Sequence, residues 1–518
     1  MEAFGESSFL KSKKRVMDVN RSVSACTRVD KISKLPDDII AHILSLFPTT
    51  EAAATSVVSH RWIELWKYTS KLTFKGGADH KFANKIGFVE LNEKTINGLK
   101  LDMHERERNI NRVNSALKSH KALSLKEFKI NFFLSKAEQQ VVREWVEFAF
   151  ARGVEKLELN LGWHERLAQS AGVVLDVEMI KSVADFKSSL KVLCVRCIEA
   201  SGDAIEMLLR HCKLLERLVL VRVRRRSDVE IIGPSLKHLD MRSRCVREYY
   251  FPEYAAEYNI KVCAPNLTWL TIDQNSKRVW LDYVPNLVNM NFYCRFPFGD
   301  TMHHFAKAAA QLQTLIIHLY KPLATFSPPQ MPKLKKLVVY YRTASTRVSL
   351  PVTRFLCAAP NLEDFKLEIS EAYMGSRPPG VFEVPKVGSR CPCGCFPHRH
   401  LKLFLLSGYF GVSKMSNLDY SNFEVSLDLV RYIVENCVVL EEIVIGHCDR
   451  VGLVKDIVDY DDESLSEIIV EPQLSYCGHV ATPEQQQAFE KIMQMQHIPR
   501  HIKLRLVFEI EPPISLKH

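Results

Sequence analysis

The sequence predicts an α/β fold in which a small three-helix unit precedes an irregular solenoid of parallel β-strands and helices. Two observations predict this arrangement. A short motif, L-x-x-L-x-L with Phe, Met, Ile or Val as substitutes, recurs twelve times between residues 125 and 445. Before it, residues 35–66 show helical apolar periodicity in a stretch too short to bury its own apolar surface.

The N-terminal unit reads LPDDIIAHILSLFPTTEAAATSVVSHRWIELW. Pro36 suits the start of a helix because its missing N–H is not needed at the first helical position, and Asp37 and Asp38 complement the helix dipole. The apolar residues that follow form one helical face and a second stripe beside it: Ile39, Ile43, Leu46 and Phe47, then Ile40 and Leu44.

Two further short helices are expected in this stretch. Pro48 ends the first helix, Thr49 or Thr50 is expected to cap the second, and Trp62 and Trp66 lie on one face of the third. Chains below about 40 residues usually need a staple or a partner to fold. The excess apolar surface is therefore either an interface for another protein or a face that packs on the rest of the chain.

This stretch resembles the F-box, and closely the plant form, at nearly every anchor position. The resemblance implies a docking module that binds a Skp-type adaptor, which in turn links it to a cullin–RING ubiquitin ligase. His60 stands where the plant pattern usually has Arg or Lys, which is expected to weaken one polar contact at most. The adaptor-contacting positions that carry over are Leu35, Pro36, Ile39, Ile40, Ile43, Val58, Ser59 and Trp62.

The repeated motif resembles a leucine-rich repeat, since most of its spacings fall near the ~20–29 residues of that unit. The last two apolar residues of each copy alternate along a strand and are expected to face inward, which predicts that Leu270 and Ile272 are buried. Unrelated strands of an ordinary α/β domain are the alternative. The copies begin at Leu125, Val154, Leu190, Leu215, Leu236, Leu267, Leu287, Leu312, Leu334, Leu362, Leu401 and Leu440.

The repeats lack the usual Asn ladder, so the solenoid is expected to be irregular, like the degenerate plant repeats that follow plant F-boxes. Five copies are preceded by a Pro-x pair, as in APNLTWL. Farther along, HRHLKLFLLSGYFG and LDLVRYIVENCVVLEEIVI are similar to the FBD domain of plant proteins. The matching residues are Gly408, Gly411, Glu435, Asn436 and Leu440 to Ile445.

These features predict six segments along the chain. They are a disordered basic tail at 1–30, the F-box at 31–70, a linker or start of the repeat domain at 71–120, irregular leucine-rich repeats at 121–390, an FBD domain at 391–470, and a C-terminal helix and strand at 471–518.

Composition excludes several protein classes. There is no run of 18 or more apolar residues, and the N-terminal stretch lacks the apolar core of a secretory signal, so no membrane association is expected. Fourteen scattered cysteines predict reduced thiols in the nucleus and/or cytoplasm, and KSKKR at residues 11–15 is a candidate nuclear import signal. The net charge of +10 permits acidic partners but does not indicate nucleic acid.

One short stretch, CPCGCFPHRH, gathers possible metal ligands. Its C-x-C-x-C spacing differs from the C-x₂-C pairs of structural zinc sites, so a connector loop is expected and no metal is assigned. The residues concerned are Cys391, Cys393, Cys395, His398 and His400.

A basic cluster supplies candidate substrate-binding residues. Residues 213–247 hold ten Lys or Arg against four Asp or Glu, and guanidinium groups bind carboxylates and phosphates well. Val221 and Val223 are expected to point to the core, which would leave the interleaved arginines at the edge of the concave surface. A solvated surface is the alternative for this set of Arg222, Arg224, Arg225 and Arg226.

The sequence contains no P-loop, G-x-S-x-G, H-E-x-x-H or dinucleotide fingerprint at a suitable place, so neither catalysis nor a cofactor is expected. The resemblances predict a substrate-recognition subunit of an SCF-type ubiquitin ligase whose repeats bind a target protein. The arginine cluster makes an acidic or phosphorylated protein the candidate target. The alternative is a repeat scaffold that binds a partner without directing ubiquitin transfer.

Overall fold

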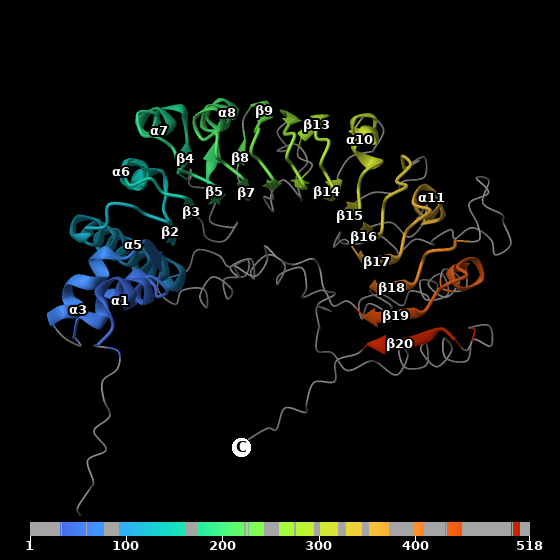
Figure 1. Ribbon diagram of the computed structural model, residues 1–518, viewed down its shortest axis with the longest axis horizontal. Helices are drawn as coiled ribbons and strands as arrows, with labels where there is room; N and C mark the ends of the chain where they lie inside the picture. Colours follow the sequence, from blue (N-terminus) through green and yellow to red (C-terminus); the bar gives the residue numbers. More distant parts are fainter. Residues whose placement is uncertain are drawn as a thin grey trace, which may run out of the picture.

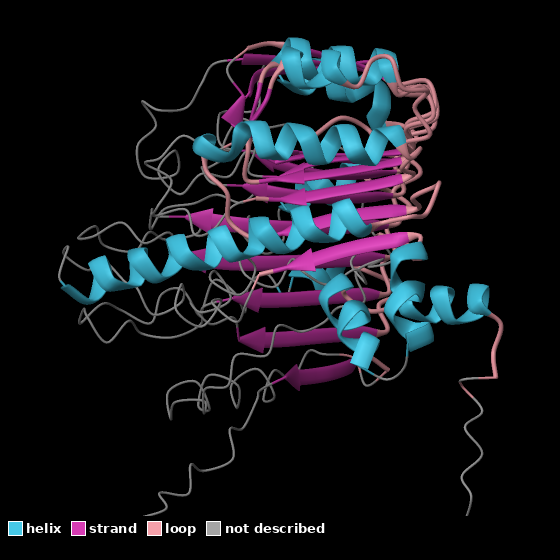
Figure 2. Ribbon diagram, turned by 90° about the vertical axis from the view of Figure 1, so that its left-hand side faces the viewer, coloured by secondary structure: helices cyan, strands magenta, loops and turns pink. Residues whose placement is uncertain are grey.

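The computed structural model describes residues 34–57, 60–76, 93–161, 173–221, 224–225, 227–242, 258–273, 276–294, 301–319, 328–343, 352–371, 398–408, 432–447 and 501–507, together with 32, 430 and 499. These residues form an arch (Figure 1). One long parallel sheet lines its inner, concave side, and helices lie on the outer, convex side. Figure 2 shows the strands running in one direction beneath the helices.

The three-helix unit lies at one end of the arch. Its helices are α1 (Asp37–Leu44), α2 (Thr49–Ala54) and α3 (His60–Leu65), with 3₁₀ turns η1 (Thr55–Val57) and η2 (Trp66–Tyr68). Pro36 precedes α1, and both aspartates lie in its first turn, as the sequence predicts. The second helix ends at Ala54, where the chain tightens into η1.

The concave sheet contains fourteen strands among the described residues, each hydrogen-bonded in parallel to the next. All twelve motif copies form neighbouring strands in it, which confirms the predicted solenoid. In order they are β1 (Lys71–Lys75), β2 (Glu127–Asn131), β3 (Lys156–Asn160), β5 (Val192–Arg196), β7 (Arg217–Val221), β10 (His238–Arg242), β12 (Trp269–Asp273), β14 (Asn289–Cys294), β15 (Thr314–Leu319), β16 (Lys336–Thr343), β17 (Asp364–Glu371), β18 (Leu403–Gly408), β19 (Glu442–His447) and β20 (Lys503–Val507).

Burial follows the predicted alternation along each strand. The first apolar residue of every copy is at most 2% exposed, and Leu270 and Ile272 are both 0% exposed. These side chains belong to one continuous core between the sheet and the convex elements. Because each strand's inward pair stacks on that of its neighbour, the core extends along the whole arch.

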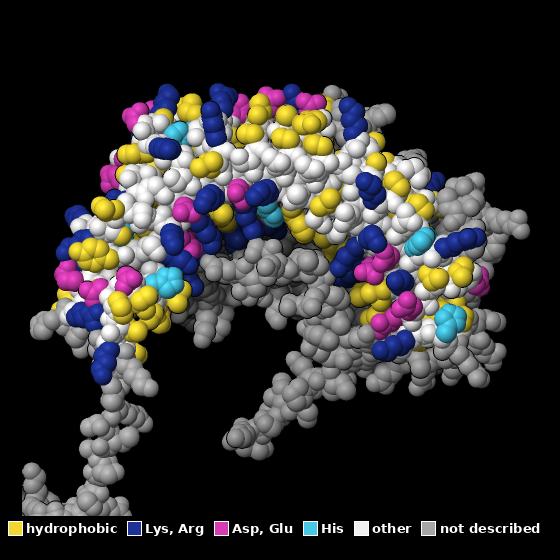
Figure 3. Space-filling view, in the orientation of Figure 1, with side chains coloured by type: hydrophobic (Ala, Val, Ile, Leu, Met, Phe, Trp, Pro, Cys, Tyr) yellow, Lys and Arg dark blue, Asp and Glu magenta, His cyan; other side chains and the backbone are white. Residues whose placement is uncertain are grey.

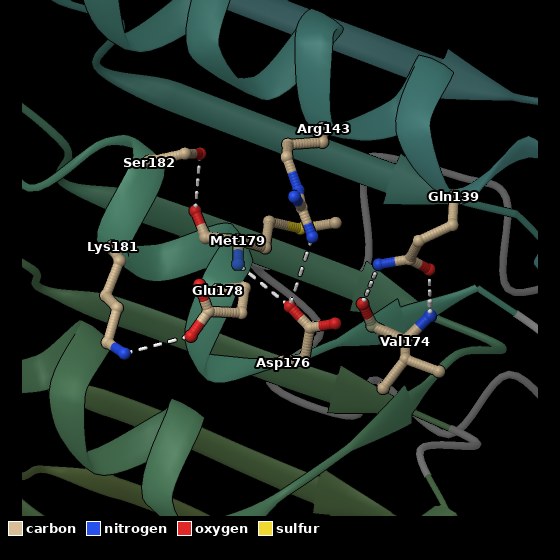
Figure 4. A network of polar contacts seen from close by, with 8 residues as sticks. All are labelled: Gln139, Arg143, Val174, Asp176, Glu178, Met179, Lys181 and Ser182. Atoms are coloured by element: carbon tan, nitrogen blue, oxygen red, sulfur yellow. Dashed lines mark hydrogen bonds and ion pairs between the residues drawn. The ribbon is translucent and has the colours of Figure 1, made fainter.

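The convex side carries helices where the connections are long. They are α5 (Glu93–Ser119), α6 (Gln139–Ala151) preceded by the 3₁₀ turn η3 (Lys136–Glu138), α7 (Val177–Ser182), α8 (Gly202–His211), α10 (Thr301–Ala309) and α11 (Val352–Ala358). Polar contacts between these elements fix their spacing (Figure 4). Gln139 of α6 exchanges two hydrogen bonds with the backbone of Val174, 2.7 and 2.8 Å long, and Nη2 of Arg143, also in α6, lies 3.9 Å from Oδ1 of Asp176, which precedes α7.

The sequence did not indicate two minor parallel sheets. One contains β9 (Val229–Ile232), β11 (Tyr258–Cys263) and β13 (Ser276–Tyr283), and the other contains β4 (Val174–Leu175), β6 (Glu199–Ala200) and β8 (Arg224–Arg225). Strands β9 and β13 lie on the convex side, where helices were expected (Figure 1). A strand advances about 3.3 Å per residue, whereas a helix advances 1.5 Å, so a strand crosses the convex side of one repeat with fewer residues.

Asparagines that precede three of the motif copies link neighbouring repeats. In the Pro-Asn-Leu turns, Asn266, Asn286 and Asn361 each donate an Nδ2–H to the carbonyl of a proline in the preceding repeat, over 2.6 to 2.8 Å. The acceptors are Pro234, Pro265 and Pro332. These asparagines precede the motif instead of following its last apolar residue, so they differ from the usual ladder that the sequence was predicted to lack.

The segments predicted at 71–120 and 391–470 are part of the same sheet. Residues 71–120 contain β1 and α5, and β18 and β19 pair in register with β17 and β20. The position of an FBD boundary at residue 391 lies outside the described residues and stays a prediction.

Candidate functional site

The three-helix unit has a small core of its own. Ile40, Leu44, Ala52, Trp62 and Leu65 form it, with Leu35 and Trp66 packed against it. Ile40 is 0% and Trp62 is 9% exposed. These two residues of the predicted adaptor-contacting set therefore hold the helices together in the free chain.

Apolar side chains also cover the outside of this unit. Ile39 is 44%, Phe47 46% and Ile63 38% exposed, while Leu46 and Val57 reach 67% and 91%. We call these five residues the apolar docking surface. The sequence prediction named Ile39 but did not include Val57 and Ile63. The helical period of α3 would have identified Ile63, because it places Trp62 and Leu65 on the buried face and Ile63 to one side of it.

The other predicted adaptor positions divide between exposed and half-buried. Pro36 is exposed, and Leu35 and Ile43 are half-buried. Val58 and Ser59 lie outside the described residues. Direct contact of this set with an adaptor stays a prediction.

Arg61 joins α3 to the start of α1, a role that the sequence analysis missed. Its Nε donates to Oδ1 of Asp37 over 2.7 Å, and its Nη2 donates to the carbonyl of Leu35 over 2.6 Å. The Leu-Pro start of α1 is therefore held by the third helix.

Hydrogen bonds attach the unit to the first strand of the arch. The N–H of Thr73 donates to Oγ1 of Thr49 over 2.8 Å, and the N–H of Ser70 donates to Oγ of Ser45 over 3.2 Å. Thr49 is the first residue of α2 and makes no capping bond, so the predicted cap was wrong. Its hydroxyl bridges to β1 instead, a partner that only the tertiary structure brings close.

Charged residues reinforce this junction. Nζ of Lys121 lies 2.6 Å from Oε2 of Glu64, and Lys67 also pairs with Glu64. Hydrogen bonds from Lys121 and Lys67 lower the pKa of Glu64 to about 2, so it stays ionised. Trp66 packs against both the small core and the main core, which makes the two parts one body.

The concave face presents three side chains per strand. On β7 these are Arg217, Val219 and Val221, between the core residues Leu218 and Leu220. Row 1 contains Arg217 and the residues of other strands in register with it, row 2 contains Val219 and those in register with it, and row 3 contains Val221 and those in register with it. The first six strands carry seven Lys or Arg in these rows and three Asp or Glu, a net charge of +4.

The three acids in these rows are all paired. Glu127 and Glu158 contact the lysines of β1, β2 and β3, over 2.8 to 3.8 Å. Asp240 accepts from Nε of Arg242 over 2.7 Å. Burial raises the pKa of Glu158, but Lys156 and Lys129 outweigh it and the net shift is downward. Within these rows, cations therefore outnumber acids by four.

An aromatic pair lies beside Arg217 in row 1. The rings of His238 and Trp269 stack with centroids 5.9 Å apart and planes 10° apart, and Nε1 of Trp269 donates to Oγ1 of Thr271 over 3.1 Å. Burial and the neighbouring Arg217 lower the pKa of His238 to about 4, so this imidazole is neutral near pH 7. Figure 3 shows Lys, Arg, Asp and Glu side chains gathered along the inner face of the arch.

The arginine cluster predicted from the sequence has a different setting from the expected one. Strand β7 ends at Val221, and Arg224 and Arg225 form β8, which pairs with β6 in a minor sheet. Val221 lies in row 3 of the concave face, so its predicted place in the core was wrong. Leu218 and Leu220 take the core positions because the motif alternation continues from Leu215. Arg222 and Arg226 lie outside the described residues, and substrate binding by this set stays a prediction.

His398, one of the five possible metal ligands, has a structural role. It is 3% exposed, its Nε2 donates to the carbonyl of Ala359 over 3.1 Å, and its Nδ1 accepts from the N–H of Leu401 over 3.1 Å. Both ring nitrogens are therefore occupied. The three cysteines of this stretch lie outside the described residues, and the described part of the chain contains no metal-binding cluster.

Residues that resemble the FBD pattern are part of this end of the arch. Gly408 ends β18, residues 432–436 are helical, and Nδ2 of Asn436 donates to the carbonyl of Tyr432 over 2.8 Å. Gly411 lies outside the described residues. Among the described helices, none has the length and apolar character needed to cross a bilayer.

Comparison with known proteins places these features in a family. The model of the At1g61320/AtMIF1 LRR domain matches residues 116–449, and the F-box domain model matches residues 32–73. Both ranges coincide with the repeat strands and the three-helix unit described above. The repeat model alone covers more than half of the chain.

Curated relatives from Arabidopsis thaliana carry the same combination in their names. The chain is 26% identical to F-box/FBD/LRR-repeat protein At4g00160 over 283 residues, which is 51% of this chain and 56% of the relative. FBD-associated F-box protein At4g10400 is 27% identical over 296 residues, 52% of this chain and 63% of the relative. F-box/FBD/LRR-repeat protein At2g04230 is 28% identical over 251 residues, 47% of each chain. The matches thus span about half to three-fifths of these relatives, and the chain belongs to the plant F-box/FBD/leucine-rich-repeat protein family.

Proposed function

We propose that this protein is a non-catalytic substrate receptor of an SCF-type ubiquitin ligase. The F-box match implies a Skp-type adaptor as partner. The proposal adds that the adaptor links the chain to a cullin–RING ligase, and that the repeats hold a protein for ubiquitination. The observation that carries it is the apolar docking surface, which a unit with its own packed core leaves exposed.

Exposed apolar side chains gathered on one small unit favour a protein interface. Monomeric proteins rarely leave such groups together without a partner, and interface cores are enriched in them. The Arg61 contacts hold the start of α1 in place, so the surface is preformed in the free chain. A preformed surface lowers the entropy lost when a partner binds.

The junction supports a mechanism based on proximity. Because the F-box and the first repeat strands form one body, a protein held on the arch would stay at a fixed distance from the adaptor. Tethering of this kind raises the effective concentration of substrate lysines near the ubiquitin-charged enzyme. The receptor itself then needs no catalytic group.

The test is co-purification of a plant Skp-type adaptor with the full chain. The Ile39→Ala/Phe47→Ala variant should lose at least about tenfold in affinity, because truncating a central interface side chain costs about 2 kcal/mol or more. The matched control is Leu123→Ala/Leu214→Ala, since these residues are also exposed, at 95% and 52%, but lie outside the F-box. Undiminished binding by the first variant, or equal loss by the control, would contradict the proposal.

A scaffold without a ligase role is the alternative. Reconstituted ligase and a captured partner distinguish the two, because only a receptor supports ubiquitin transfer to that partner. Arg222, Arg224, Arg225 and Arg226 stay candidate substrate-binding residues, and replacing all four with Gln should reduce partner capture while adaptor binding persists. We place the protein in the nucleus and/or cytoplasm, where such ligases act.

A further inference from the structure

We propose that the concave faces of β5, β7 and β10 bind an acidic segment of a partner protein. The inference rests on the proposed function in that the arch holds the substrate, and it adds where and by what chemistry. It concerns residues different from the arginine cluster at 222–226.

Charge is uneven along the concave face. Rows 1 to 3 carry a net charge of +4 on the first six strands, whereas the same positions on the eight remaining strands hold four Lys or Arg and four Asp or Glu. The acids of the basic half are already paired with lysines or with Arg242. A ligand attracted by this field must therefore supply its own negative charge.

The excess charge centres on strand β7. Arg196 and Arg242 are both in register with Val221, so they flank it from the two neighbouring strands, about 10 Å apart. Arg217 lies at the other end of the same strand and has no acidic partner among the described residues. Arg196 contacts the thiol of Cys194, whose pKa is raised by burial, so that this neighbour stays neutral.

Apolar and aromatic groups lie between these guanidinium groups. Val219, in the centre of β7, is 4% exposed, Val221 at the end of β7 is half-buried, and the stacked His238 and Trp269 adjoin Arg217. Since His238 is neutral near pH 7, it adds no charge to the patch. The surface therefore suits carboxylate or phosphate groups that alternate with an apolar side chain.

This pattern favours a protein segment over nucleic acid. Tight binding of nucleic acid uses many phosphate contacts, about 6–10 in typical cases, and a strongly basic groove. Here three arginines lie on three strands, and one of them is already paired with Asp240. An acidic peptide with two or three carboxylates needs no more than this.

The experiment measures fluorescence anisotropy with the full chain bound to its adaptor. The probes are a 12-residue fluorescein-labelled peptide with six Glu or Asp and two Leu, its Gln and Asn counterpart, and a 12-nucleotide single strand. The acidic peptide should bind at least about tenfold tighter than the neutral one, a difference of about 1.4 kcal/mol. Its affinity should fall steeply between 50 and 300 mM salt, since exposed charges are screened over about 10 Å at 0.1 M.

Variants then locate the site. Arg196→Gln/Arg217→Gln should weaken the acidic peptide at least about fivefold, and Arg217→Lys should retain most of the affinity because it keeps the charge. The single Arg217→Gln variant removes a group without an acidic partner in the described region, and its circular dichroism and adaptor binding should match the parent if only the peptide site is affected. The convex control Arg210→Gln/Lys213→Gln makes the same charge change in a neighbouring part of the chain, where Arg210 is 72% exposed.

Equal binding of the neutral peptide, preferential binding of the oligonucleotide, or an equal effect of the convex control would overturn the inference. Adaptor binding is measured in a separate experiment without any peptide. Loss of adaptor binding alone would contradict the proposed function but not this site. Loss of peptide binding alone would contradict this site but not the proposed function.

Discussion

At the scale of single residues, alternation along each strand determines whether a side chain faces the core or the concave side. Leu218 and Leu220 enter the main core, while Arg217, Val219 and Val221 between them face the concave side. A slip of one residue would exchange these sets and place guanidinium groups in the core. The register is therefore strongly determined by the apolar pair of each motif copy.

Leu270→Asp tests this register. Leu270 is 0% exposed, so the change places an unpaired carboxylate in the core and should destabilise neighbouring repeats by more than about 4 kcal/mol. Urea unfolding followed by circular dichroism measures the loss. Thr268→Asp is the control, because Thr268 is exposed two residues earlier. A midpoint unchanged from the parent would show that the assigned register is incorrect.

His238 should make stability depend on acid pH. Its pKa is about 4 in the folded chain and about 6.5 when unfolded, so the unfolded state binds more protons between these values. The contribution of neutral His238 to the free energy of unfolding is fully present above about pH 6.5 and is lost as the pH falls toward 4. His238→Asn should flatten the dependence of the urea midpoint on pH across this window. An identical pH profile in the variant and the parent would argue against a buried neutral imidazole.

At the scale of elements, the connections between repeat strands form either helices or further strands. The connections that hold β9 and β13, residues 222–237 and 274–288, are shorter than those that hold α6 and α8, residues 132–155 and 197–216, but β11 lies in a connection as long as these, residues 243–268. Backbone groups of these strands pair with one another in a separate sheet. The apolar pattern alone does not distinguish the two, since both bury one face against the main sheet.

The Pro-Asn-Leu turns should each stabilise the stacking of two repeats. Asn286→Ala removes the 2.8 Å bond to the carbonyl of Pro265, which should cost about 1 kcal/mol. Thermal unfolding measures the effect, and Asn111→Ala at an exposed position of α5 is the control. If both variants melt like the parent, the hydrogen bond of this turn contributes nothing to stability.

At the scale of the whole molecule, the junction makes the F-box and the arch one body. Trp66 contributes to both cores, and hydrogen bonds from β1 and the segment before it end on Thr49 and Ser45. An F-box on a flexible tether would bring a bound protein near the adaptor only intermittently. The geometry instead favours a constant separation between the docking surface and the concave face.

Thr49→Val should loosen this junction without unfolding the arch. The N–H of Thr73 would lose its acceptor, at a cost of about 1–3 kcal/mol for an unsatisfied buried donor. Hydrogen exchange should rise in α1 to α3 and stay unchanged in β12 to β17. Thr55→Val is the control, because its hydroxyl bonds only within the same unit, to Ala52. Uniform protection in both variants would show that this bond does not couple the two parts.

The sequence by itself determined the repeat strands, their inward residues and the helical unit with its apolar surface. Each of these is encoded locally, by a period of two or of 3.6 residues and by turn residues at fixed offsets. The strand β1 escaped detection because Thr69, and not Leu, stands at the first position of its copy.

Only the tertiary structure decided which residues meet across the fold. Ile40 and Trp62 pack together in the small core, Thr49 bonds to β1, and Nε2 of His398 donates to the carbonyl of Ala359, each with a partner distant in sequence. The basic centre on β5, β7 and β10 arises in the same way, because Arg196, Arg217 and Arg242 come from three repeats. The motif defines equivalent positions in each copy, but only the parallel stacking of neighbouring repeats brings these side chains onto one face.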